Sequence, residues 1–140
     1  MIILIIKRKV SHENMKITIY VIQPLKYPHS LPQIIKQSLK EKHPNIRFQI
    51  KQNYIKKMSA STNIYFIIND PQLKSWDGLS ISKKIRQNEP NSPLILASTI
   101  INYTQFFRSH IGFLGIINLH ETSQNEIESY LEDSIKLVIT

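Results

Sequence analysis

The stretch of sequence from Ile64 to Arg86 reads IYFIINDPQLKSWDGLSISKKIR, and it decides the fold. An apolar run with the length of a β-strand ends at Asp70, a polar loop follows, and Asp77-Gly78 opens a helical pattern. Open α/β sheets place their functional side chains just beyond the carboxyl ends of their strands. Asp70 is therefore the first candidate site residue.

The same alternation of strand and helix extends over the rest of the chain. Further strands are predicted at 17–22, 46–50, 94–97 and 114–117. Apolar residues recur at helical spacing between 31 and 39, 79 and 85, 101 and 108, and 127 and 138, and 53–60 is a candidate short helix. Ser30–Gln33 and Ser123–Glu126 have the spacing of capping boxes. The pattern predicts a five-stranded parallel α/β sheet of order 2-1-3-4-5 with helices on both faces.

Length and composition limit the class of protein. The 140 residues fit one domain with one core. The absence of cysteine excludes disulfides, thiolate catalysis and Cys-based zinc sites, and the five histidines have no ligand spacing, so no metal site is predicted. No apolar run approaches the ~20 residues of a membrane-spanning helix. These features favour a cytoplasmic protein without a membrane partner.

The first residues read MIILIIKRKV. Their positive charge follows the apolar run, whereas a signal peptide has it in front. A clean strand pattern begins after Met15, which has the character of an original start. We therefore expect residues 1–14 to be an N-terminal extension without fixed structure, and 15–140 to form the domain. The rival interpretation makes Ile2–Ile6 an edge strand.

Residues 15–138 resemble a response-regulator receiver domain, which is a CheY-like, flavodoxin-like fold. Gly78 follows Asp70 by eight residues, which is the family's spacing between the phosphoacceptor and the start of the third helix. Pro93–Ser98 is similar to the fourth strand with its terminal Thr or Ser. The resemblance places Asp70 at the phosphoacceptor position and makes Ser98 an accessory remnant.

The segment Asp70–Leu73 is most similar to the receivers of peptide-pheromone regulators, which usually carry a LytTR-type DNA-binding domain. This resemblance implies a module of two-component signalling and transcription regulation. It also implies that DNA is contacted only through a domain beyond this chain, because these residues contain no DNA-binding motif.

The chain departs from the family pattern at the metal ligands. Receivers bind Mg²⁺ through an acidic pair at the end of the first strand, because a hard cation takes carboxylate oxygens. Here that pair falls on Ile22 and Gln23, and residues 14–40 contain no Asp or Glu. A shift of alignment would not restore the pair, so Mg²⁺ binding is predicted to be lost and no cofactor is expected.

The fifth strand lacks the remaining phosphorylation residues. The family Lys falls on Leu119, or on His120 if the loop differs by one residue, and the reporter aromatic falls on Ile116. Leu cannot pair with an anion, and a His of ordinary pKa is mostly neutral at pH 7. Together with Ile22 and Gln23, these positions form a degenerate pocket with no predicted catalytic residue.

The resulting hypothesis is a non-enzymatic pseudo-receiver that acts by contact with a protein partner or with a second copy, as a homodimer. Three aromatic residues, Tyr103, Phe106 and Phe107, lie at helical spacing, and at least two are expected in the core, leaving the rest for an interface. Trp76 is assigned either to partner contact or to covering the vacated acidic pocket.

Two alternatives stay open. In the first, Asp70 still accepts phosphate in a degenerate pocket, although it could equally be a structural strand-end carboxylate. In the second, the chain is a basic nucleic-acid-binding module. Residues 1–60 hold 12 Lys and Arg against 2 acidic residues, whereas residues 61–140 hold 6 against 8.

Overall fold

The computed structural model describes residues 16–56 and 62–139. The elements are β1 (Ile17–Ile22), α2 (Leu31–Lys42), β2 (Arg47–Lys51), β3 (Thr62–Asn69), α3 (Gly78–Asn88), β4 (Leu94–Ser98), α4 (Tyr103–Arg108), β5 (Gly115–Asn118) and α5 (Gln124–Ile139). The strands pair in parallel in the order β2-β1-β3-β4-β5. The predicted five-stranded sheet of order 2-1-3-4-5 is confirmed. The predicted extension 1–14 lies outside the described residues.

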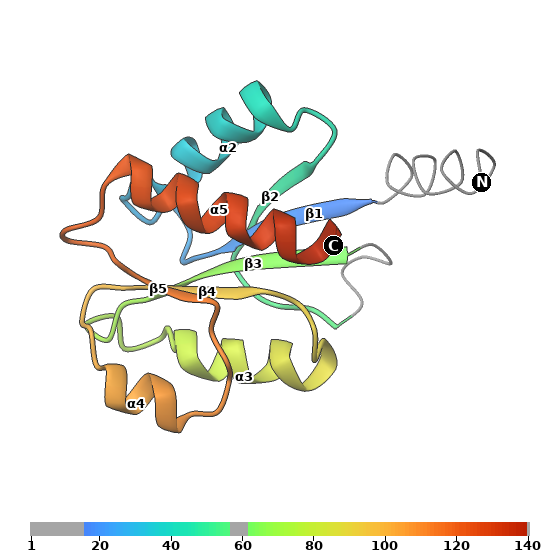
Figure 1. Cartoon of the computed structure of the whole chain (residues 1–140). Coiled ribbons are helices and arrows are strands. Elements are labelled where there is room, and N and C mark those ends of the chain that lie inside the picture. The colour runs from blue at the N-terminus through green and yellow to red at the C-terminus, as the bar shows by residue number, and fades with distance from the viewer. Residues whose placement is uncertain (1–15, 57–61, 140) are drawn as a thin grey trace, which may run out of the picture.

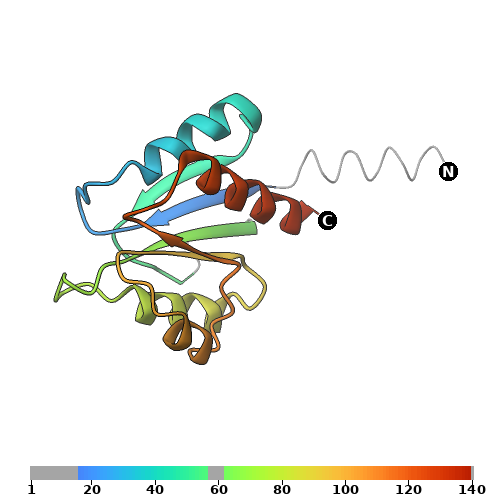
Figure 2. The same ribbon diagram turned by 60° about the vertical axis from the view of Figure 1, so that its left-hand side comes forward.

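Helices cover the sheet on both faces, with α2 and α5 on one side and α3 and α4 on the other (Figure 1, Figure 2). Side chains alternate between these faces along each strand. Ile19 and Phe66 pack in the cluster under α2 and α5, whereas Tyr20 and Ile67 pack in the cluster under α3 and α4. The central strands β1 and β3 are buried on both faces, which explains their nearly continuous apolar sequence.

Two helix starts test the capping predictions. The Glu126 backbone N–H donates to Ser123 Oγ at 3.1 Å, as the spacing predicts for α5. Ser30 makes no side-chain capping bond, so the capping box predicted at 30–33 is wrong. Its backbone is already helical (φ −81°, ψ −3°), whereas capping requires an extended residue whose side chain reaches back. The Leu31 N–H donates instead to His29 Nδ1 at 3.0 Å.

The connection from β2 to β3 differs from the sequence prediction. Residues 53–56 are not helical, so that part of the candidate helix 53–60 is wrong, and 57–61 lie outside the described residues. Tyr54 packs against the cluster under α3, edge-on to Tyr65 with ring centroids 5.8 Å apart. The Tyr54 hydroxyl donates to Glu89 at 2.7 Å, so one aromatic side chain fastens this connection to the sheet.

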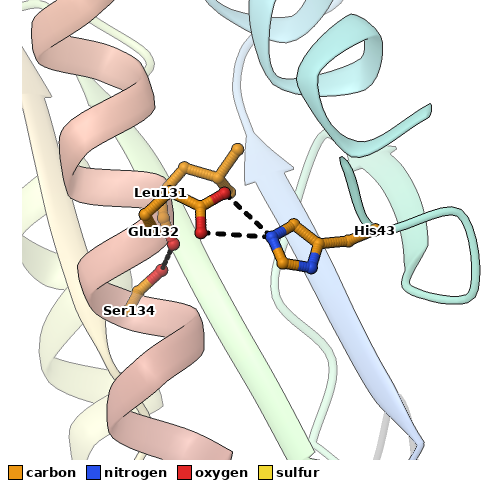
Figure 3. A network of polar contacts seen from close by, with 4 residues as sticks. All are labelled: His43, Leu131, Glu132 and Ser134. Carbon is orange, nitrogen blue, oxygen red and sulfur yellow. Dashed lines mark hydrogen bonds and ion pairs between the residues drawn. The ribbon is translucent and has the colours of Figure 1, made fainter. Parts of the chain in front are cut away.

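A polar contact joins α2 to α5 on the opposite face (Figure 3). His43, which follows α2, lies 2.8 Å from a Glu132 carboxylate oxygen, measured from Nε2. In the same part of α5, the Ser134 hydroxyl donates to the Leu131 carbonyl at 2.7 Å. The contact fixes the end of α2 beside α5 above the apolar cluster.

Among the described residues, none of the helices has the length and apolar character needed to cross a bilayer.

Helix α3 starts in close contact with the end of β3. Asp77 caps it by accepting the Ser80 N–H at 3.0 Å, and the Ser80 hydrogen bonds lower the pKa of the Asp77 carboxyl. A Cβ on Gly78 would collide with the Ile68 carbonyl oxygen and would lie 2.9 Å from Asn69 Cα. Only glycine fits at this position. The Asp77-Gly78 pair therefore fixes where the loop that begins at Asp70 meets helix α3.

We predict that Gly78→Ala lowers the free energy of unfolding by about 1–3 kcal/mol, because backbone atoms of β3 must shift to admit the methyl group. Urea unfolding measures the change. Gln87→Ala, on an exposed position of the same helix, is the matched control and should change stability by less than about 0.5 kcal/mol. Equal effects of both substitutions would contradict the close packing.

Candidate functional site

The carboxyl ends of β1, β3, β4 and β5 meet along one edge of the sheet, which is where parallel sheets hold their functional groups. Asp70 directly follows β3 and is half-buried. Its carboxylate accepts three hydrogen bonds: from the Tyr27 hydroxyl at 2.9 Å, from the Gln72 N–H at 3.1 Å and from the Thr99 hydroxyl at 3.3 Å. The Asp70 carboxylate thus joins the loops after β1, β3 and β4.

The sequence-predicted pair of Asp70 and Ser98 is not joined by a hydrogen bond. Ser98 lies in register with Asn69, the last residue of β3, and both side chains are buried. Asn69 Nδ2 donates to Ser98 Oγ at 3.0 Å, and that hydroxyl donates to the Ile100 carbonyl at 2.7 Å. Sequence reasoning missed Asn69, although its position as the last strand residue before Asp70 was a signal.

The end of β1 carries no charge. Ile22 is fully buried in the cluster under α3, and Gln23 is 6% exposed with an Oε1 atom that has no hydrogen-bond partner. Among the residues that the structure describes, no group of three or more His, Cys, Asp or Glu side chains could hold a metal ion. An apolar side chain, a neutral amide and one engaged carboxylate do not fit an Mg²⁺ site.

The position predicted to replace the family Lys is part of the core. The Leu119 side chain is buried under α2 and α5, whereas His120 is exposed. The Leu119 carbonyl lies 3.1 Å from His29 Nε2, and because His29 Nδ1 accepts from Leu31, Nε2 carries the proton and donates. His29 therefore ties the loop after β1 to the end of β5.

Tyr27 and His29 together hold this β1–α2 loop across the sheet edge. Between the strand and these two anchors, Lys26 adopts a left-handed backbone with φ 57°. Leu25 beside it is an exposed aliphatic side chain. Non-glycine residues rarely adopt this conformation, so the two side-chain anchors hold a strained turn in place.

Trp76 has a structural role in the loop that precedes α3. Its ring is half-buried against the cluster under α3, and its indole N–H donates to the Ile68 carbonyl at 2.7 Å. This contact ties the loop to β3. A contribution of Trp76 to partner binding stays a prediction.

Of the three aromatic residues of α4, only Phe106 is core, at 4% exposed. Tyr103 and Phe107 are 67% and 83% exposed, so the prediction that at least two are buried is wrong. Helix α4 has six residues, and Phe106 is the one that is buried. Tyr103 and Phe107 lie on its exposed side. The exposed rings border a groove of about 560 Å³, whose further lining includes His110, Phe113 and Ile116.

A second polar cluster lies at the opposite, amino-terminal end of the strands, and no pattern in the sequence indicated it. The Glu89 carboxylate, at the end of α3, accepts hydrogen bonds from the hydroxyls of Tyr54, Tyr65 and Ser92 and from the Asn63 amide. Burial first, and then the bond to Glu89, raise the pKa of both the Tyr54 and Tyr65 phenols. This group is structural and lies away from Asp70.

Comparisons with known proteins identify the fold. No protein-family model and no curated protein matches the sequence. The structure is similar to the phosphorylated cyanobacterial phytochrome response regulator RcpA, with a TM-score of 0.60 and 15% identity over 89% of this chain and 94% of that one. For the isolated REC domain of RcsB from Salmonella enterica serovar Typhimurium the TM-score is 0.61, with 17% identity over 88% and 90% of the two chains.

A CheY-like response regulator receiver domain protein from Methanospirillum hungatei aligns with a TM-score of 0.61 and 13% identity, over 89% of this chain and 95% of that one. The chain therefore has the CheY-like fold of response-regulator receiver domains.

We predict that Asp70→Asn lowers the pKa of the Tyr27 phenol, which burial and the bond to Asp70 raise to about 12. The raised pKa means that Tyr27 contributes its stabilisation fully below about pH 10 and loses it as the pH rises through about 12. Ultraviolet titration of the phenols, with Tyr27→Phe to isolate this ring, measures the shift. Glu121→Gln, an exposed carboxyl near the same edge, should leave the titration unchanged. An unchanged Tyr27 pKa in Asp70→Asn would contradict the contact.

Proposed function

We propose that this domain is a pseudo-receiver, a regulatory module that acts through protein contact without Mg²⁺-dependent phosphorylation of Asp70. The observation that carries the proposal is the state of the Asp70 carboxylate. Its oxygens are bonded by neutral donors of Tyr27, Gln72 and Thr99. Phosphoryl transfer depends on cations that offset the charge of the incoming group, and the end of β1 offers only Ile22 and Gln23.

Charge at the Asp70 site supports the same proposal. Leu119, which follows β5, is uncharged and buried in the apolar cluster under α2 and α5, so it supplies no cation to the site. The Tyr27 hydroxyl donates a hydrogen bond to the Asp70 carboxylate but adds no positive charge. Such a donor stabilises the unmodified Asp and does not offset the charge of a phosphoryl group. In this proposal Asp70 organises the surrounding loops instead of accepting a phosphoryl group.

Incubation with acetyl phosphate and Mg²⁺, followed by intact-mass measurement, tests the proposal. We expect no stoichiometric phosphate adduct on the wild-type chain. Tyr27→Phe removes the hydroxyl from Asp70 and should also give no adduct, because the metal ligands remain absent. A stoichiometric adduct that disappears in Asp70→Asn would establish the alternative, a phosphorylatable receiver with a degenerate pocket.

The contact surface that we propose is the exposed side of α4 with the neighbouring groove. Tyr103 and Phe107 lie four residues apart on one side of the helix, and both rings are largely exposed. Aromatic side chains at this exposure are common anchors of protein interfaces. A second copy of the domain, forming a homodimer, is the occupant that we propose.

We predict that the double substitution Tyr103→Ser, Phe107→Ser shifts the protein towards monomer in sedimentation equilibrium, because it removes the apolar area that two copies would bury. Stability of the monomer should change little, since neither ring is part of the core. Leu25→Ser, an equally exposed apolar position in another loop, serves as the control. A wild-type chain that stays monomeric at high concentration would refute the homodimer.

The nucleic-acid-binding alternative stays a prediction. The Lys and Arg side chains of the described N-terminal half are distributed over α2, β2 and their loops. Retention on DNA or RNA that weakens steeply with salt would support it.

A further inference from the structure

Strand β2 forms an open edge of the sheet. Within the described residues it pairs with β1 alone, as the first strand in the order β2-β1-β3-β4-β5. The Lys51 carbonyl faces β1, since it accepts the Gln23 N–H at 2.9 Å. Backbone groups of a strand point alternately to its two sides, so the N–H and C=O groups of Phe48 and Ile50 point away from the sheet. Among the described residues these groups have no strand partner, and a further strand would pair through them.

The face of β2 on the side of α3 is cationic. Arg47, Gln49 and Lys51 lie in register with Thr18, Tyr20 and Ile22 of β1, which places them on that face. Both charged side chains are exposed, and residues 52–56, which follow β2, form no covering helix. The sequence from Lys42 to Asn69 contains no Asp or Glu. In the part of the chain that the structure describes, neither Arg47 nor Lys51 forms an ion pair with an Asp or Glu.

The opposite face of β2 is apolar. Phe48 packs at the margin of the cluster under α2 and α5, whereas Ile50 is 42% exposed. At the end of the strand a groove of about 380 Å³ is lined by Gln49, Lys51, Gln52, Asn53 and Ile55. The edge thus offers main-chain hydrogen bonds, a row of positive charge on one face and exposed aliphatic surface on the other.

We propose that the β2 edge binds an extended segment of a partner protein, in which acidic and apolar residues alternate, as a sixth strand of the sheet. Side chains of an added strand lie beside those of β2 with the same period of two, so its carboxylates would face Arg47 and Lys51 and its apolar residues Ile50. Opposite charges across neighbouring strands stabilise the pairing.

Charge decides against a second copy of β2 as the occupant. Antiparallel pairing of two β2 strands about Gln49 would place Arg47 opposite Lys51 twice, and like charges in these positions are destabilising. The groove also lacks an aromatic ring among its described lining residues, and single-stranded nucleic acid binds largely through base stacking on such rings. An acidic peptide is the partner chemistry that fits.

A fluorescent peptide of about six residues, alternating Glu and Val, tests the proposal by anisotropy against the full chain. We expect saturable binding that weakens as salt rises, with slower amide exchange at Phe48 and Ile50. Arg47→Glu with Lys51→Glu should weaken binding about tenfold or more, because two attractive cross-strand pairs become repulsive. The same double variant should favour a peptide alternating Lys and Val.

The matched control is Lys84→Glu with Arg108→Glu, which reverses one Lys and one Arg on exposed positions of α3 and α4 and should leave peptide affinity within about twofold. Ile50→Pro removes one outward N–H at an edge position that tolerates proline, and it should also weaken binding. Equal peptide affinity of the wild-type chain and of the Arg47→Glu, Lys51→Glu variant would overturn the proposal. Absence of peptide binding at low salt would overturn it too. Binding of single-stranded DNA through Arg47 and Lys51 without peptide binding would overturn it as well. None of these measurements involves Asp70.

Discussion

The double-sided burial of β1 and β3 is the constraint on which the rest of the structure depends. Both strands lie in the middle of the sheet with helices over each face, so their side chains are out of water on either side. A charged group at the end of such a strand needs a paired charge, a bound cation or several hydrogen bonds to compensate for its burial. Ile22 and Gln23 at the end of β1 carry no charge and avoid that requirement.

The Asp70 carboxylate shows the same principle at the end of β3. The charge of Asp70 remains, but it is half-buried and satisfied by hydrogen bonds from hydroxyl and backbone groups. Tyr27 and Thr99 both come from loops other than that of Asp70, and the shorter bond, from Tyr27 at 2.9 Å, holds the β1–α2 loop beside the end of β3. The Asp70 carboxylate thereby joins the three loops that follow β1, β3 and β4.

The strand order, the helices on both faces and the position of Asp70 could be predicted from the sequence because they follow from hydrophobic periodicity and from the DG spacing. Three details could not. Ser30 has the right chemistry for a cap but the wrong backbone conformation, and the sequence pattern does not encode that conformation. The partner of Ser98 is Asn69 because of strand register, and Tyr103 and Phe107 lie on the exposed side of α4, a side that helical spacing alone does not identify.

The β2–β3 connection has a consequence for local stability. Strand β2 pairs with β1 along one side. In the connection that follows β2, the Tyr54 hydroxyl donates to the Glu89 carboxylate. A strand with one hydrogen-bonded neighbour and much exposed surface opens at lower free energy than the strands enclosed on both sides. Of the two edge strands, β2 carries more exposed side chains than β5, so we expect its amides to lose protection before those of the inner strands β1, β3 and β4.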